Sequence, residues 1–127
     1  MMYVSVVALL VAGLIHLLPV SGVMGAAALT RLYGVDLLDT NVSILLQHRA
    51  LLFGLLALWM FGAIAVLSLR LIVLAVALFS TTSFIAVALW VGGYNSAIAR
   101  VVAADAIAAM LLAAGLFAEL WLMRQRD

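Results

Sequence analysis

The sequence predicts an all-α fold, a bundle of four transmembrane helices with a short polar, interfacial segment between the first and the second. Hydrophobic residues make up 70% and charged residues 9% of the 127 residues, against about 45–50% and about 25% in soluble domains. A chain of this size cannot hide so much apolar surface from water. Its apolar residues also form long runs instead of the alternation typical of β-barrel strands. We therefore expect a single integral membrane domain over residues 1–127.

The spans follow from these runs, because each crossing helix needs about 20 apolar residues. The first is predicted over residues 3–29, with a kink near Pro19, whose ring removes a helical hydrogen bond. Residues 44–91 would make a helix about 70 Å long, more than twice the thickness of the hydrocarbon layer. The chain is therefore expected to reverse at Ser68–Arg70, which gives spans over 42–69 and 71–91. The fourth span is predicted over 97–123.

Local signals mark several helix ends. Asp39, Thr40, Asn41 and Ser43 are all side chains that can cap the start of the second span. Gly92–Asn95 reads as a turn, and Asn95 or Ser96 is expected to cap the fourth span. Residues 25–33, which follow the kink, are expected to form a separate short helix at the membrane surface. The run before it is predicted to be a retained span, since no basic residue precedes it as in a signal peptide.

Composition excludes several kinds of function. With six arginines, no lysine and five acidic residues, the chain has no basic stripe for nucleic acid. It has no cysteine and only two histidines, so any metal site must be sparse. Phosphate-binding loops, nucleophile elbows and metalloprotease motifs are also missing. We therefore predict no catalytic residues and no resident cofactor, and favour a non-catalytic role.

The arginines also bear on orientation. An even number of spans places both termini and the turn between the second and third spans on one side of the membrane. That side carries Arg70, Arg124 and Arg126, and the other carries Arg31, Arg49 and Arg100. Because Arg49 and Arg100 are expected to be partly embedded, the positive-inside rule favours cytoplasmic termini.

Ionisable residues within membrane spans are costly and are the first candidates for a functional site. If the helices begin and end as predicted, Arg49, Ser83 and Asp105 each lie about 12 Å from the same membrane face. These depths predict a polar pocket in the half of the bundle away from the termini. The pocket residues are expected to be His16, His48, Arg49, Ser83, Tyr94, Arg100 and Asp105, with Arg49 and Asp105 as an ion pair.

Several interpretations of this cluster remain open. The Arg49–Asp105 pair could be only a structural clamp, because a buried charge demands a partner. A pocket between bundle helices could also hold a lipid or a quinone-like ligand. His16 and His48 could be the two axial ligands of a haem. As a further alternative, the chain could be a small oligomeric transporter that uses Asp105 as a proton-coupled carboxylate.

Small residues predict close helix packing. The fourth span is rich in alanine, and the second contains Ala50-x-x-x-Gly54, which lets helix backbones approach closely in lipid. The same faces could dock a partner subunit or a second copy. The alternative to a ligand-binding protein is therefore a structural subunit packed into a larger membrane complex.

Four segments together resemble the small uncharacterised bacterial four-helix membrane proteins of the DoxX-like group. They are Gly13–Pro19, Leu32–Gly34, Leu46–Gly54 with its Gln47-His48-Arg49 run, and Gly92–Asn95 followed by Arg100 and Asp105. The resemblance implies a four-helix bundle in a bacterial inner membrane and a link to quinone-dependent oxidoreductase systems. Some similar proteins are labelled phosphopantetheine adenylyltransferases, but this chain has neither an α/β nucleotide-binding pattern nor a phosphate loop.

Overall fold

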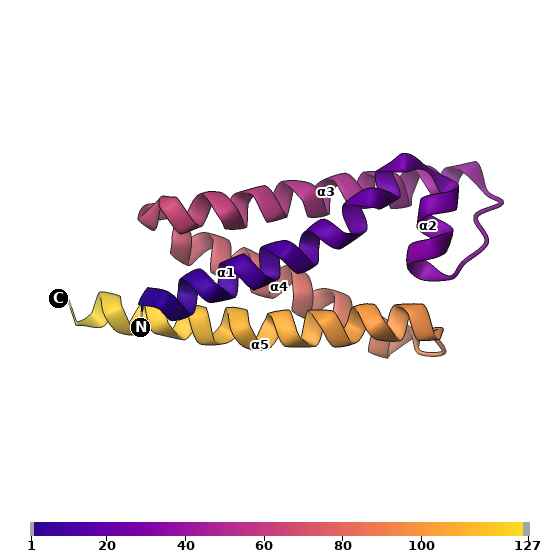
Figure 1. Cartoon of the computed structure of the whole chain (residues 1–127). Coiled ribbons are helices and arrows are strands. Elements are labelled where there is room, and N and C mark those ends of the chain that lie inside the picture. The colour runs from indigo at the N-terminus through magenta and orange to yellow at the C-terminus, as the bar shows by residue number, and fades with distance from the viewer. Residues whose placement is uncertain (1, 126–127) are drawn as a thin grey trace.

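The computed structural model describes residues 2–125, and within that range the chain is helical almost throughout and has no strand. The all-α prediction is therefore confirmed. The long helices run alternately up and down as a bundle (Figure 1). In chain order the elements are α1 (Met2–Leu17), the 3₁₀ helix η1 (Leu18–Met24), α2 (Ala26–Tyr33), α3 (Thr40–Ala65), α4 (Leu67–Val91) and α5 (Ser96–Arg124).

Four stretches are long and apolar enough to cross a membrane: Tyr3–Met24, Thr40–Ala65, Leu67–Val91 and Ser96–Arg124. At 1.5 Å per residue, even the shortest of them, the 22 residues of Tyr3–Met24, measures about 33 Å, more than the roughly 30 Å of a hydrocarbon core. The structure is thus that of an integral membrane protein. The start of α1, the end of α5 and the turn between α3 and α4 lie at one end of the bundle, and α2 lies across the other (Figure 1). We call these the terminal end and the α2 end.

The turn between α3 and α4 differs from the prediction. The helices are interrupted at Val66, which has an extended backbone conformation, and not at Ser68–Arg70. Arg70 is buried in the first turn of α4, and its guanidinium reaches back to carbonyls at the end of α3. A polar residue marks a turn only when its side chain faces water. Arg70 instead satisfies the carbonyls that the end of a helix leaves without partners.

The expected change of direction near Pro19 occurs as a change of helix type. The α-helix ends at Leu17, and the chain continues as the 3₁₀ helix η1 with Pro19 in its first turn. The predicted short helix over 25–33 is confirmed as α2. It ends at Gly34, whose left-handed backbone (φ 63°) lets its N–H bond to Thr30 O at 2.8 Å. This bend and short helix carry the chain over the α2 end of the bundle.

The hydrophobic core lies toward the terminal end. Its fully buried residues come from all four long helices and are mostly small or aliphatic: Ala8, Leu9, Ala12, Met60, Ala63, Val73, Leu74, Ala77, Ala108 and Leu112. Their positions are residues 8–12 of α1, 60–63 of α3, 73–77 of α4 and 108–112 of α5. The backbones of α3 and α5 do not approach each other closely at any point in the described chain, so side chains fill the space between these two helices.

One asparagine joins the two connections at the α2 end. Asn95 Oδ1 accepts a hydrogen bond from Ile98 N at 2.9 Å and so caps α5. Its Nδ2 donates to Tyr33 O at 2.8 Å and to Gly34 O at 3.1 Å. The predicted cap is confirmed, and the same side chain holds the end of α2 against the start of α5.

Replacing Asn95 with alanine should lower the free energy of unfolding by about 1–2 kcal/mol, because it removes a helix cap and leaves the end of α2 without its donor. Asn95→Asp keeps the capping oxygen, so its free energy of unfolding should fall by less than that of Asn95→Ala. The measurement is reversible unfolding with dodecyl sulfate in mixed micelles, with the exposed Asn41→Ala as control. Equal effects of Asn95→Ala and Asn41→Ala would show that the link is unimportant.

Candidate functional site

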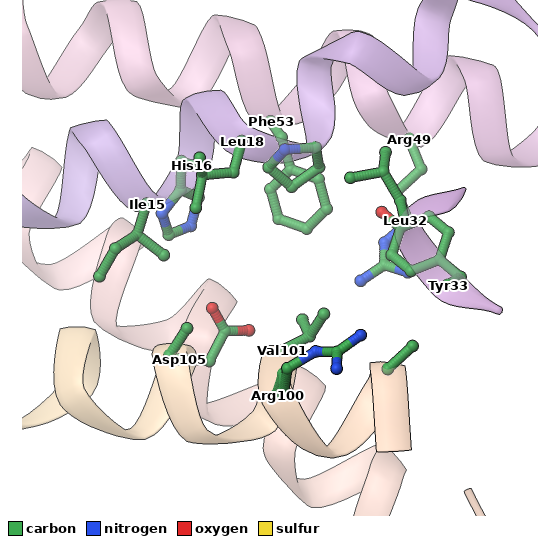
Figure 2. Close-up of a pocket in the computed structure, with 13 residues that line it drawn as sticks. Ile15, His16, Leu18, Leu32, Tyr33, Arg49, Phe53, Arg100, Val101 and Asp105 are labelled. Carbon is green, nitrogen blue, oxygen red and sulfur yellow. The ribbon is translucent and has the colours of Figure 1, made fainter. Parts of the chain in front are cut away.

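A cavity of about 190 Å³ lies between α1, η1, α2, α3 and α5 near the α2 end. Figure 2 shows His16 and Asp105 toward one side of it, and Arg49, Tyr33 and Arg100 toward the other. The walls between these polar side chains are apolar. The lining residues are Ile15, His16, Leu18, Pro19, Leu32, Tyr33, Arg49, Phe53, Ala97, Arg100, Val101, Ala104 and Asp105. The cavity thus combines a largely apolar wall with a few polar groups, as ligand sites commonly do.

His16 closes one side of the cavity from the last turn of α1. Its side chain is 2% exposed, and its ring packs edge-on against Phe53, with the centroids 5.4 Å apart. Nδ1 lies 2.8 Å from Ala12 O. A carbonyl oxygen can only accept, so Nδ1 donates and Nε2 carries the lone pair. Nε2 is buried and has no hydrogen-bond partner within the described residues, which is unusual for a buried polar atom.

Asp105 and Arg49 line the same cavity, but the expected ion pair between them does not form. Arg70–Glu119 is the sole ion pair among residues 2–125. The Arg49 guanidinium carbon instead lies 5.7, 4.9 and 4.8 Å from the ring centroids of Tyr33, Phe53 and Phe84. Three aromatic faces stabilise the cation by cation–π attraction, so that Arg49 does not depend on a carboxylate for its stability.

Asp105 is 6% exposed and accepts no hydrogen bond from the part of the chain that the structure describes. A buried carboxylate without donors is energetically costly. Among residues 2–125, no donor satisfies His16 Nε2 or the Asp105 carboxylate, and both side chains line the cavity.

Arg100 and Tyr33 complete the side of the cavity nearer the α2 end. Arg100 is exposed, comes from the first turns of α5 and lines the cavity. Burial raises the pKa of the Tyr33 phenol, the nearby Arg49 charge opposes this shift, and the Asp105 charge adds to it. The phenol of Tyr33 therefore stays neutral at physiological pH and remains able to donate a hydrogen bond.

A second cavity of about 490 Å³ lies between α3 and α4, on the other side of Arg49. Arg49 and Phe53 line both cavities. Ser83 lines only the second cavity, where its hydroxyl donates to Ser80 O at 2.9 Å. Ser83 therefore shares a cavity with Arg49 on the α4 side but does not line the polar cavity.

Two predicted site residues lie elsewhere. His48 and Tyr94 are exposed and line neither of the two cavities. His48 precedes Arg49 and lies about 100° from it around the helix axis. Because Arg49 lines the cavities, the side chain of His48 faces outward. His16 and His48, which the haem alternative would use as a ligand pair, are thus not brought to one cavity. Within residues 2–125 no three His, Asp or Glu side chains gather as a metal site requires.

A second buried polar cluster, at the terminal end, was missed by the sequence analysis. Arg70 donates to Ala63 O at 3.2 Å and Ile64 O at 2.7 Å, and its Nη1 lies 3.4 Å from Glu119 Oε1. The same carboxylate oxygen accepts from Ser5 Oγ at 2.5 Å. Glu119 is the only acidic residue of α5 besides Asp105, a signal that could have suggested a buried partner. This cluster ties α1, α3, α4 and α5 together and lies away from both cavities.

Comparisons with protein-family models, with curated proteins and with solved structures returned no match. The resemblance to the DoxX-like group stays a prediction.

Proposed function

We propose that the protein binds the polar head of a lipid- or quinone-like amphiphile in the cavity between His16, Arg49 and Asp105. The observation that carries the proposal is the buried Nε2 of His16, which has no hydrogen-bond partner within the described residues and belongs to a side chain that lines the cavity. Leaving a buried polar atom unpaired costs about 1–3 kcal/mol. A ligand that supplies the missing hydrogen bond recovers that free energy when it binds.

The size of the two cavities supports an amphiphile. At about 190 Å³, the polar cavity is smaller than the 300–1,000 Å³ of sites that enclose a whole small molecule. It suits a head group or a single ring. The cavity of about 490 Å³ between α3 and α4 meets it at Arg49 and Phe53 and has a mainly apolar lining, which provides room for a hydrocarbon tail beside the bilayer.

The proposal also assigns a place in the membrane. With the cytoplasmic termini that the arginine distribution favours, the cavity lies in the outer leaflet of a bacterial inner membrane. A quinone head in this position would make the protein an accessory to a membrane oxidoreductase system, as the DoxX-like resemblance implies.

Replacing Arg49 with glutamine should weaken amphiphile binding by ten- to one-hundredfold, because hydrogen bonds to a charged donor contribute about 1.5–3 kcal/mol. The purified protein in detergent is titrated with phosphatidylethanolamine, phosphatidylglycerol or decylubiquinone, and bound adducts are counted by native mass spectrometry. The matched control is Arg31→Gln, on the exposed surface of α2.

A saturable adduct with one of these probes that is lost in Arg49→Gln and kept in Arg31→Gln supports the proposal. Melting temperatures of both variants show whether the bundle is intact. If no probe forms a saturable adduct, or if Arg49→Gln binds as tightly as the wild type, the cavity is not the binding site.

A further inference from the structure

The polar cavity has two chemically different ends. Arg49 and Arg100 lie nearer the α2 end, whereas His16 and Asp105 lie deeper in the bundle (Figure 2). Asp105 follows Arg100 by five residues on α5, which corresponds to about 7.5 Å along the helix axis. The ligand therefore meets hydrogen-bond donors at one end and hydrogen-bond acceptors at the other.

The arginine end requires an acceptor. The Arg49 guanidinium carbon lies over three aromatic rings, and within residues 2–125 its N–H groups donate no hydrogen bond. Arg100 likewise donates none there. Two guanidinium groups, with N–H donors arranged in a planar fork, fit the oxygens of a phosphate or carboxylate.

The deeper end requires a donor that also carries positive charge. His16 Nε2 offers a lone pair, because Nδ1 is engaged with Ala12 O. The Asp105 residue is 6% exposed. Within the described residues its carboxylate accepts no hydrogen bond and forms no salt bridge, and the Arg49 charge acts on it only at longer range. A primary ammonium group has three N–H donors and a full charge. It can satisfy the imidazole and the carboxylate together, which a neutral hydroxyl cannot do electrostatically.

We propose, building on the function proposed above, that the ligand's head joins an anionic group to a primary ammonium, as in phosphatidylethanolamine. The phosphate lies between Arg49 and Arg100, and the ammonium lies between His16 and Asp105. Only two carbon atoms separate the phosphate ester oxygen from the nitrogen in such a head, which suits the short cavity. The acyl chains extend past Arg49 and Phe53 into the cavity between α3 and α4.

A series of head groups tests this assignment. The full chain in detergent is presented with phosphatidylethanolamine, its mono-, di- and trimethylated derivatives and phosphatidylglycerol, all with the same acyl chains, and binding is measured by native mass spectrometry. Phosphatidylethanolamine should bind at least about tenfold more tightly than phosphatidylcholine, whose trimethylammonium group has no N–H to donate. Phosphatidylglycerol, which lacks the cation, should bind as weakly as phosphatidylcholine.

Two pairs of variants assign the preference to its residues. His16→Phe keeps an aromatic ring against Phe53 but removes the acceptor, and its control is the exposed His48→Phe. Asp105→Asn keeps the shape but removes the charge, and its control is the exposed Asp36→Asn. The tenfold preference for phosphatidylethanolamine over phosphatidylcholine should disappear in His16→Phe and Asp105→Asn and persist in both controls. Asp105→Asn, which is nearly isosteric, serves alone if His16→Phe does not fold.

Free phosphoethanolamine is added as a competitor to identify the source of the head group. Competition only at concentrations far above those of the lipid supports a membrane lipid, whereas equally tight binding supports the same head-group chemistry in a soluble ligand. Equal binding of phosphatidylethanolamine and phosphatidylcholine overturns this inference. If lipid binding without a head-group preference is still lost in Arg49→Gln, the proposed function stands and only the head-group inference fails. If no amphiphile binds, the proposed function and the head-group inference both fail.

Discussion

Arg70→Gln is expected to lower the free energy of unfolding by about 3–5 kcal/mol, the range for breaking a buried ion pair by removing one partner. The variant leaves Glu119, whose side chain is 14% exposed, without its cation. It also removes the donors to Ala63 O and Ile64 O, the carbonyls at the end of α3. The decrease in the free energy of unfolding is measured by unfolding with dodecyl sulfate in mixed micelles, followed by circular dichroism.

Two comparisons separate this cause from a general loss of charge. Arg124→Gln removes an exposed arginine in the last turn of α5 and should change stability by less than about 0.5 kcal/mol. The double variant Arg70→Met/Glu119→Leu removes both charges and should recover much of the loss, since apolar replacements of a buried pair are often neutral. A double variant less stable than Arg70→Gln alone would contradict this account.

The fold was predictable because membrane insertion leaves few choices. Long apolar runs must be helices, since every backbone group in lipid needs an internal partner. Asp39 and Asn95 were recognisable as caps from residue type and position, and the structure confirms both. The turn at Val66 was not predictable in the same way, because no polar residue marks it. The polar residues nearest to it, Ser68 and Arg70, both lie within α4, and Arg70 turns back into the protein.

The depth of the candidate site residues in the membrane was predictable from the sequence. The direction in which each side chain points was not. Helical rise alone places Arg49 and Asp105 at similar depths, and both line one cavity. The partners of Arg49 were missed because aromatic rings in an apolar sequence give no signal that distinguishes a cation–π contact from ordinary packing. Phe53, one turn beyond Arg49, could have been suspected from its i+4 position. Which side of the helix His48 faces depends on packing that residue spacing does not fix.

Small residues decide how closely α1 and α5 approach at the terminal end. A Cβ added to Gly115 would lie 2.9 Å from Ala8 Cβ and 3.3 Å from Ser5 Cα. These atoms belong to or adjoin the backbone of α1 and cannot rotate away, so the two helices must separate. Gly115→Ala should therefore lower the free energy of unfolding by about 1–3 kcal/mol, as overpacking of a core does, and Gly115→Leu should lower it further.

Gly62→Ala is the control that separates the effect of helix packing on stability from the effect of helix propensity. Gly62 is an exposed glycine of α3, and a Cβ there would meet nothing within 4 Å. Helix propensity favours alanine over glycine by about 0.5–1 kcal/mol at both positions. Gly62→Ala should thus be neutral or stabilising, and the opposite sign at Gly115 can come only from the close packing of α1, and of Leu74 on α4, against this position. Stabilisation by Gly115→Ala in the same unfolding assay would mean that the two helices pack less closely than the structure shows.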